Sequence, residues 1–224
     1  MIGSLFTSAA GMRTLLEQQD VIANNLANAS TPGFKRSSAG FLALVNQAQT
    51  ITNPTTPAPP SVRSVVPTLI VHTDVRPGTM TDTKDPTDLA IDGEGSFVVG
   101  TPGGERLTRS GSFTLNDTGQ LVTREGYPVL GEGGPIQVSG TNWTVDTSGN
   151  VSVDKTIVGK LRIEGSQQPG RIIQGSLEDS NVNVVQEMVS MITGLRAYEA
   201  NQKAVQAIDQ TLDKAINQMG RSNS

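Results

Sequence analysis

The chain contains no cysteine, a single histidine and only 4% aromatic residues. The missing thiols exclude disulfides, thiol catalysis and the usual cysteine-based zinc sites. One histidine without a Gly-x-Ser-x-Gly motif does not supply a serine-hydrolase triad. No stretch approaches the roughly 18 apolar residues of a membrane span, and the N-terminus lacks the charged and apolar regions of a cleaved signal peptide. We therefore expect a non-enzymatic protein with no cofactor, no membrane insertion and no cleaved signal.

The sequence also lacks an excess of basic residues, since it contains 17 basic and 21 acidic residues and has a net charge of −4. Without a run of Lys or Arg to neutralise phosphates, we expect no nucleic-acid binding. One acidic cluster, Asp82, Asp85, Asp88 and Asp92, resembles a calcium loop in composition only. Its 3-3-4 spacing does not match the alternate ligands of such a loop. We interpret the cluster as a solvated turn and expect no metal site.

The C-terminal segment 183–220 carries the pattern of a long helix. Apolar residues recur at alternating spacings of four and three, which is typical of a coiled-coil seam, and Asn183 with Gln186 suits a capping box. Such a helix is about 50 Å long and needs partners. Because Gln202 and Asp209 interrupt the seam, we interpret it as an interface for several neighbours. The seam includes Val184, Met188, Leu195, Tyr198, Val205, Leu212 and Ile216.

Residues 2–28 predict a first helix with the same rhythm, but its stripe is thin because several seam positions are alanine. A thin stripe buries little apolar area, so this helix depends on tertiary packing. Either both helices cover a globular core, or they pair with each other and with other copies. We predict the second arrangement. The N-terminal seam residues are Leu5, Met12, Leu16 and Leu26.

Three asparagines, Asn24, Asn25 and Asn28, crowd the end of this helix. They are either a frayed, solvated helix end or polar groups that make lateral contacts with neighbouring chains, and we list them as interface candidates. The Pro32-Gly33 pair then suits a type II turn that stops the helix, and Phe34 anchors the exit.

The middle of the chain changes character. Residues 37–66 include a Pro/Thr-rich stretch that reads as a linker or surface loop. From 67 to 159, short β-prone runs alternate with glycine-rich turns every 8–12 residues or so, which favours an antiparallel meander or small barrel. The predicted fold is α+β. We expect a helical coiled-coil domain made of residues 1–36 and 180–224 and an inserted β domain made of residues 67–159. The two domains are joined by connecting regions at 37–66 and 160–179.

Several runs of residues form a series of motifs: Ala23–Lys35, Asp88–Val99, Thr108–Phe113, Gly119–Val122, Gly126–Gly131, Leu177–Val182, Glu187–Val189 and Arg196–Asn201. These runs resemble the signatures of flagellar rod, hook and hook-associated proteins, and within them the basal-body rod proteins of the F/G type. The departures, Ser96 in place of an aromatic and Leu107 in place of a tyrosine, fall on the β surface.

The resemblance implies a structural subunit of the flagellar basal-body rod, which polymerises through its terminal helices into the drive shaft that transmits torque to the hook. It implies export by the flagellar type III apparatus and a place in the periplasmic rod beside other rod and hook proteins. It does not separate the F type from the G type, and the short chain also suits a rod paralogue of bacteria without an outer membrane. The alternative is a β binding module dimerised by a coiled coil.

Overall fold

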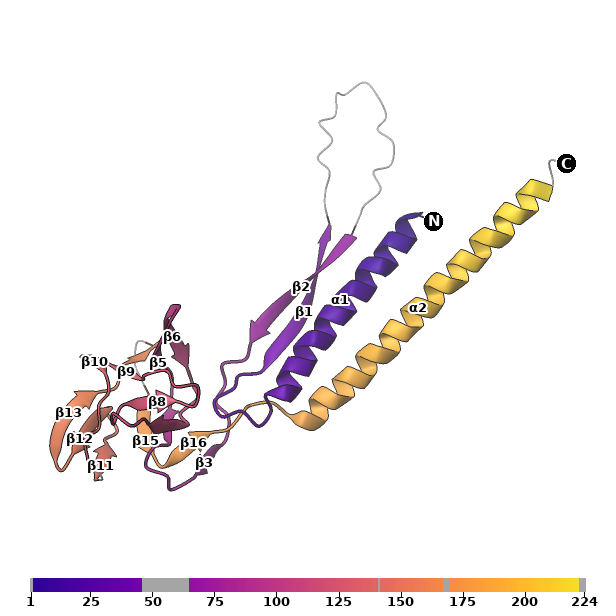
Figure 1. The fold of residues 1–224 in the computed structure, drawn as a ribbon. Coiled ribbons are helices and arrows are strands. Elements are labelled where there is room, and N and C mark those ends of the chain that lie inside the picture. Colours follow the sequence, from indigo (N-terminus) through magenta and orange to yellow (C-terminus); the bar gives the residue numbers. More distant parts are fainter. Residues whose placement is uncertain (1, 46–64, 141, 167–169, 222–224) are drawn as a thin grey trace, which may run out of the picture. The chain divides into compact units, whose positions relative to one another are not determined.

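The structure is a computed structural model that describes residues 2–45, 65–140, 142–166 and 170–221 (Figure 1). It confirms an α+β chain with a helix at each end and antiparallel strands between them. The chain forms two compact units. The helical unit comprises 1–26, 37–73 and 184–224, and the β unit comprises 27–36 and 74–183.

The helical unit contains α1 (Ile2–Ala27) and α2 (Val184–Arg221), each within one residue of its predicted ends. Asn183 directly precedes α2, where a short polar side chain can cap free backbone N–H groups. Glu187 lies in the first turn of α2, where the helix dipole favours a negative charge. Periodicity therefore locates both helices, and capping marks the start of α2.

A long hairpin completes the helical unit. Strand β1 (Ser37–Val45) pairs antiparallel with β2 (Val65–Thr73), from Ser37 opposite Thr73 to Val45 opposite Val65. The sequence alone grouped residues from 67 onward with the β domain, whereas contacts here group β2 with the helices. The prolines of the expected linker lie outside the described residues. His72 lies in β2, as its β-prone surroundings predict.

The β unit consists of short strands whose pairings are all antiparallel, as predicted. Local hairpins join β5 to β6, β7 to β8, β9 to β10, and β11 through β12 to β13. The last three strands instead return to the first three, so that β14 pairs with β5, β15 with β4 and β16 with β3. The strands are β3 (Met80–Asp82), β4 (Leu89–Asp92), β5 (Ser96–Thr101), β6 (Gly104–Thr108), β7 (Phe113–Leu115), β8 (Leu121–Thr123), β9 (Leu130–Gly131), β10 (Gly134–Pro135), β11 (Trp143–Val145), β12 (Asn150–Val153), β13 (Thr156–Lys160), β14 (Ile163–Glu164), β15 (Arg171–Gln174) and β16 (Ser176–Glu178).

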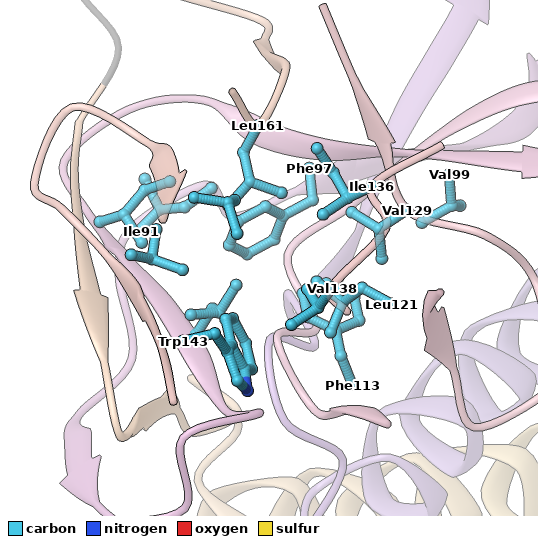
Figure 2. Close-up of a cluster of buried hydrophobic side chains, with 14 of the residues drawn as sticks. Ile91, Phe97, Val99, Phe113, Leu121, Val129, Ile136, Val138, Trp143 and Leu161 are labelled. Carbon is cyan, nitrogen blue, oxygen red and sulfur yellow. The ribbon is translucent and has the colours of Figure 1, made fainter. Parts of the chain in front are cut away.

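One hydrophobic cluster fills the β unit (Figure 2). Phe97 and Phe113 meet edge to face, with ring centroids 5.2 Å apart, a geometry that aromatic quadrupoles favour. Trp143, the only tryptophan of the chain, lies in the same cluster. Ile172 joins it from β15, directly opposite Ile91 of β4. The core is therefore complete only when the C-terminal strands have returned.

We predict that Ile172→Ala destabilises the β unit by about 2–5 kcal/mol, because it leaves a cavity in the core. The neighbouring Ile173 provides a matched control, since its side chain points outward and is 38% exposed. Ile173→Ala should cost about 1 kcal/mol or less. Urea unfolding followed by Trp143 fluorescence measures both losses, and equal losses would contradict the assigned orientation of β15.

Candidate assembly site and a buried polar junction

A buried carboxylate lies at the centre of a polar junction in the β unit. Glu178, at the end of β16, is 1% exposed. Its Oε1 accepts hydrogen bonds from Lys35 Nζ at 2.5 Å and from the Gly78 N–H at 3.0 Å. Its Oε2 accepts a bond from Arg109 Nη1 at 3.2 Å. Three separate parts of the chain thus converge on one side chain.

Removing a carboxylate from water costs several kcal/mol, which only good partners offset. Both cations at Glu178 are themselves largely buried, and their remaining donors also find acceptors. Lys35 Nζ donates to the Arg76 carbonyl at 2.9 Å, and Arg109 Nη2 donates to the Gly93 carbonyl at 2.7 Å. The junction is a satisfied network, which makes removal of any one member expensive.

The turn after α1 requires glycine at this junction. The Phe34 N–H donates to the Thr31 carbonyl, and Gly33 between them has φ +70°, which confirms the predicted type II turn. The Gly33 N–H also donates to the Glu178 carbonyl at 2.6 Å. A Cβ on Gly33 would lie 2.3 Å from the Arg109 carbonyl carbon. Only glycine permits both the turn and this approach.

Asn181 joins neighbouring loop segments of the β unit through its side-chain amide. Its Oδ1 accepts the Arg36 N–H at 2.7 Å, and its Nδ2 donates to the carbonyls of Asp74 and Arg76 at 3.0 and 2.9 Å. Its own N–H donates to the Phe34 carbonyl. One side chain therefore fixes the register of three neighbouring segments.

A second buried polar group lies in the helical unit. Asn25 is fully buried, and its amide accepts the Ser37 N–H at 2.9 Å and donates to the Ser37 carbonyl at 2.7 Å. Its Nδ2 also lies 3.2 Å from Glu187 Oε2, and Glu187 too is fully buried. Asn25 thus links the end of α1 to the first residue of β1 and to the first turn of α2.

Helices α1 and α2 also approach each other farther along. Gln19 Nε2 donates to the Met191 carbonyl at 3.0 Å. A Cβ on Gly194 would lie 2.1 Å from the same Nε2, so the absent side chain at Gly194 makes this approach possible.

The predicted seam residues are distributed over three environments. Met12, Leu26, Tyr198 and Val205 are half-buried, as are Asn28 and, in the β unit, Phe34. Asn24 is exposed, and Leu16, Val184, Met188 and Leu195 are exposed despite being apolar, Leu195 by 49%. The side chains of Leu5, Leu212 and Ile216 lie outside the described part of the chain.

The exposed apolar surface on α2 is wider than the predicted seam. Val185, Val189 and Ile192 are also exposed, Val185 by 71%. We call Val184, Val185, Met188, Val189, Ile192 and Leu195 the α2 stripe. A heptad template samples a single line of residues along the helix and misses these neighbours. The sequence does show them, because Val185 and Val189 each directly follow a seam residue and lie four residues apart.

The junction charges were not predicted as site residues. Lys35, Arg109 and Glu178 lie within the recognised motifs, but nothing local in the sequence shows that a charge in a β-prone run is buried and paired. Among the described residues, no group of three or more His, Cys, Asp or Glu is placed to hold a metal ion. None of the described helices has the length and apolarity to cross a membrane.

We predict that Glu178→Gln destabilises the β unit by about 3–5 kcal/mol, because it leaves two buried cations without a counter-charge. Glu132→Gln is the matched control, since Glu132 pairs with Lys160 at 2.6 Å on the surface. An exposed pair contributes about 0–1 kcal/mol. Unfolding followed by Trp143 fluorescence distinguishes the two, and a small loss for Glu178→Gln would show that the buried network is dispensable.

Asp74 yields a prediction about pH. Hydrogen bonds from the Arg76 side chain and backbone lower the pKa of Asp74 from 3.8 to about 2. Since the folded-state pKa lies below the unfolded value, this group favours folding above pH 3.8 or so and loses that effect as pH falls through about 2. An NMR titration of the carboxyl carbon should show a midpoint near 2 that moves toward 3.8 in Arg76→Ala. A midpoint near 3.8 before substitution would refute the pairing.

Comparison with known proteins covers most of the chain. Residues 5–35 match the family "Flagella basal body rod protein", residues 90–153 match "Flagellar hook protein FlgE/F/G D1 domain", and residues 173–219 match "Flagellar basal body rod FlgEFG protein C-terminal". The matched regions contain Lys35, Arg109 and Glu178, so each family region contributes one charge to the junction.

Individual relatives align over nearly their whole length. The flagellar basal-body rod protein FlgG of Buchnera aphidicola subsp. Schizaphis graminum is 35% identical over 262 residues, covering 96% of this chain and 98% of the relative. The rod protein FlgF of Rhizobium meliloti is 32% identical, covering 97% and 98%, and FlgF of Salmonella typhimurium is 32% identical, covering 95% and 96%. With about a third of its residues shared across almost the full length of each relative, the chain belongs to the family of flagellar basal-body rod proteins.

Proposed function

We propose that the chain is a structural subunit of the flagellar basal-body rod and polymerises through its terminal helices into the shaft that transmits torque to the hook. The α2 stripe is the observation that carries this proposal. Contiguous exposed apolar surface of this kind marks an interaction site. Full burial of one such side chain is worth about 1.5–3 kcal/mol, so covering the stripe provides a strong driving force for association.

In this proposal α1 and α2 pair as a coiled coil whose outer edges contact other copies. Gln19, Asn25 and Glu187 hold the helices together within one chain. The thin stripe of α1 leaves the α2 stripe uncovered, so neighbouring chains must cover it. Contacts of this head-to-tail kind do not close on themselves and give a helical tube.

The proposed partners are other copies of the chain, other rod and hook proteins, and the flagellar type III export apparatus, with the periplasmic rod as the place of assembly. The relatives support this proposal, because proteins named as flagellar basal-body rod components of both the FlgG and the FlgF type align over the full chain. The β unit, whose buried Glu178 is paired within the chain, then shapes the outside of the tube.

We predict that Leu195→Asp abolishes polymerisation, because it places a charge in the α2 stripe. Ala204→Asp is the matched control, since Ala204 is exposed and nine residues farther along, on the opposite face of the helix. Sedimentation and electron microscopy at rising concentration report assembly, and motility of cells carrying each variant reports rod function. Trp143 fluorescence should show the β unit folded in both variants.

Normal rods in cells that carry Leu195→Asp would refute assembly through α2. A closed dimer at all concentrations, in place of open polymers, would instead favour a dimeric binding module.

A further inference from the structure

The β unit has a free strand edge at β6. In the described chain β6 pairs only with β5, and the two-residue loop makes Thr101 and Gly104 the closing pair. Hydrogen-bonded and non-hydrogen-bonded pairs alternate from there, so the backbone groups of Glu105 and Leu107 point away from β5. The Leu107 side chain is 53% exposed.

A groove of about 530 Å³ lies beside this edge, within the β unit. Pro32, Leu107, Phe113 and Tyr127 form its apolar lining. Arg106 and Arg124, both exposed, add positive charge, and Glu125 adds one negative charge. The groove therefore suits an extended segment that carries apolar side chains and an acidic residue.

A second free edge lies at the start of β13, ahead of Lys160, whose carbonyl accepts the Glu132 N–H at 2.9 Å. The turn Asp154-Lys155 has positive φ at both residues, as in a type I′ hairpin, and Val153 and Thr156 close it. The backbone groups of the next residue, Ile157, therefore point away from β12. Ile157 is 65% exposed, and Val158 beside it is also exposed. Apolar edge strands of this kind invite pairing with another chain.

We propose that the β12–β13 hairpin of one subunit docks in the β6 groove of the next subunit, with β13 added beside β6. Ile157 and Val158 then cover Leu107 and Tyr127. Asp154 faces Arg106 and Arg124 in the groove. This contact rests on the proposed function, because it needs copies held side by side.

A second copy of the chain is the proposed occupant of the groove, because the hairpin and the groove are complementary surfaces that lie apart within one chain. The hairpin tip offers Asp154, Lys155 and two exposed apolar side chains. The groove offers counter-charges in Arg106, Arg124 and Glu125, and apolar partners in Leu107 and Tyr127. Figure 1 shows β6 and β13 at opposite ends of the β unit, so the groove is not filled by the hairpin of its own chain. Two different surfaces that match each other make a heterologous contact, which continues along a polymer.

A cross-linking experiment tests this contact, and the absence of native cysteine removes all background. Chains with Leu107→Cys and chains with Ile157→Cys are mixed, allowed to polymerise and oxidised mildly. Directly paired strand residues lie within disulfide range, so we expect a disulfide dimer of the two chains. A chain that carries both substitutions should give a ladder of dimers, trimers and longer products.

Leu115→Cys replaces Leu107→Cys in the control mixture, because Leu115 is an exposed apolar residue on β7 of the same unit. We expect at least a tenfold lower yield from this mixture. Electron microscopy of the same samples reports polymerisation independently.

Polymers without the 107–157 cross-link would overturn the inference and leave the proposed function standing. Cross-links confined to Leu107→Cys alone or Ile157→Cys alone would also overturn it, since they indicate pairing of like edges. Absence of any polymer would count against both the proposed function and this contact.

Discussion

The ionic contact of Glu178 with Lys35 and Arg109 is the constraint on which the β unit depends. Each charge comes from a different part of the chain, and Lys35 and Glu178 are 143 positions apart in the sequence. None of the three can be buried without the others, because an unpaired buried charge costs several kcal/mol. A hydrophobic cluster of the same size would tolerate other pairings of the chain segments. The charges of this network are satisfied in only one arrangement of those segments. The segment that follows α1 is thereby joined to the segment that precedes α2.

The nested return of the last strands extends the same constraint to the core. Because β14, β15 and β16 pair with β5, β4 and β3, the earliest strands of the β unit receive their partners last. Pairings so distant in sequence carry a large loop-closure entropy and form slowly. A chain that emerges N-terminus first lacks the β4–β15 and β3–β16 pairs until residues 171–178 arrive. Completion of the β unit is therefore coupled to the appearance of the segment leading into α2.

The sequence predicted local features well and distant ones poorly. Periodicity located both helices, capping located the start of α2, and Pro32-Gly33 located the turn, because these signals are contained in a few neighbouring residues. The β1–β2 hairpin was missed because its strands are separated by a long insertion that conceals their register. The role of Glu178 was missed because burial of a charge depends on residues far away in the chain. The full width of the α2 stripe was missed because a heptad pattern follows one line of side chains.

The two units differ in where their charged and apolar side chains find packing and hydrogen-bond partners. In the β unit, buried charges and apolar side chains find their partners within the chain, so ordering entropy is offset internally. In the described part of the helical unit, polar contacts such as those of Asn25 join the elements, and α2 keeps its apolar stripe exposed. A long helix gains most of its stability from tertiary packing, and in the proposed assembly other chains supply that packing for the α2 stripe. The β unit, by contrast, contains a complete hydrophobic core within one chain.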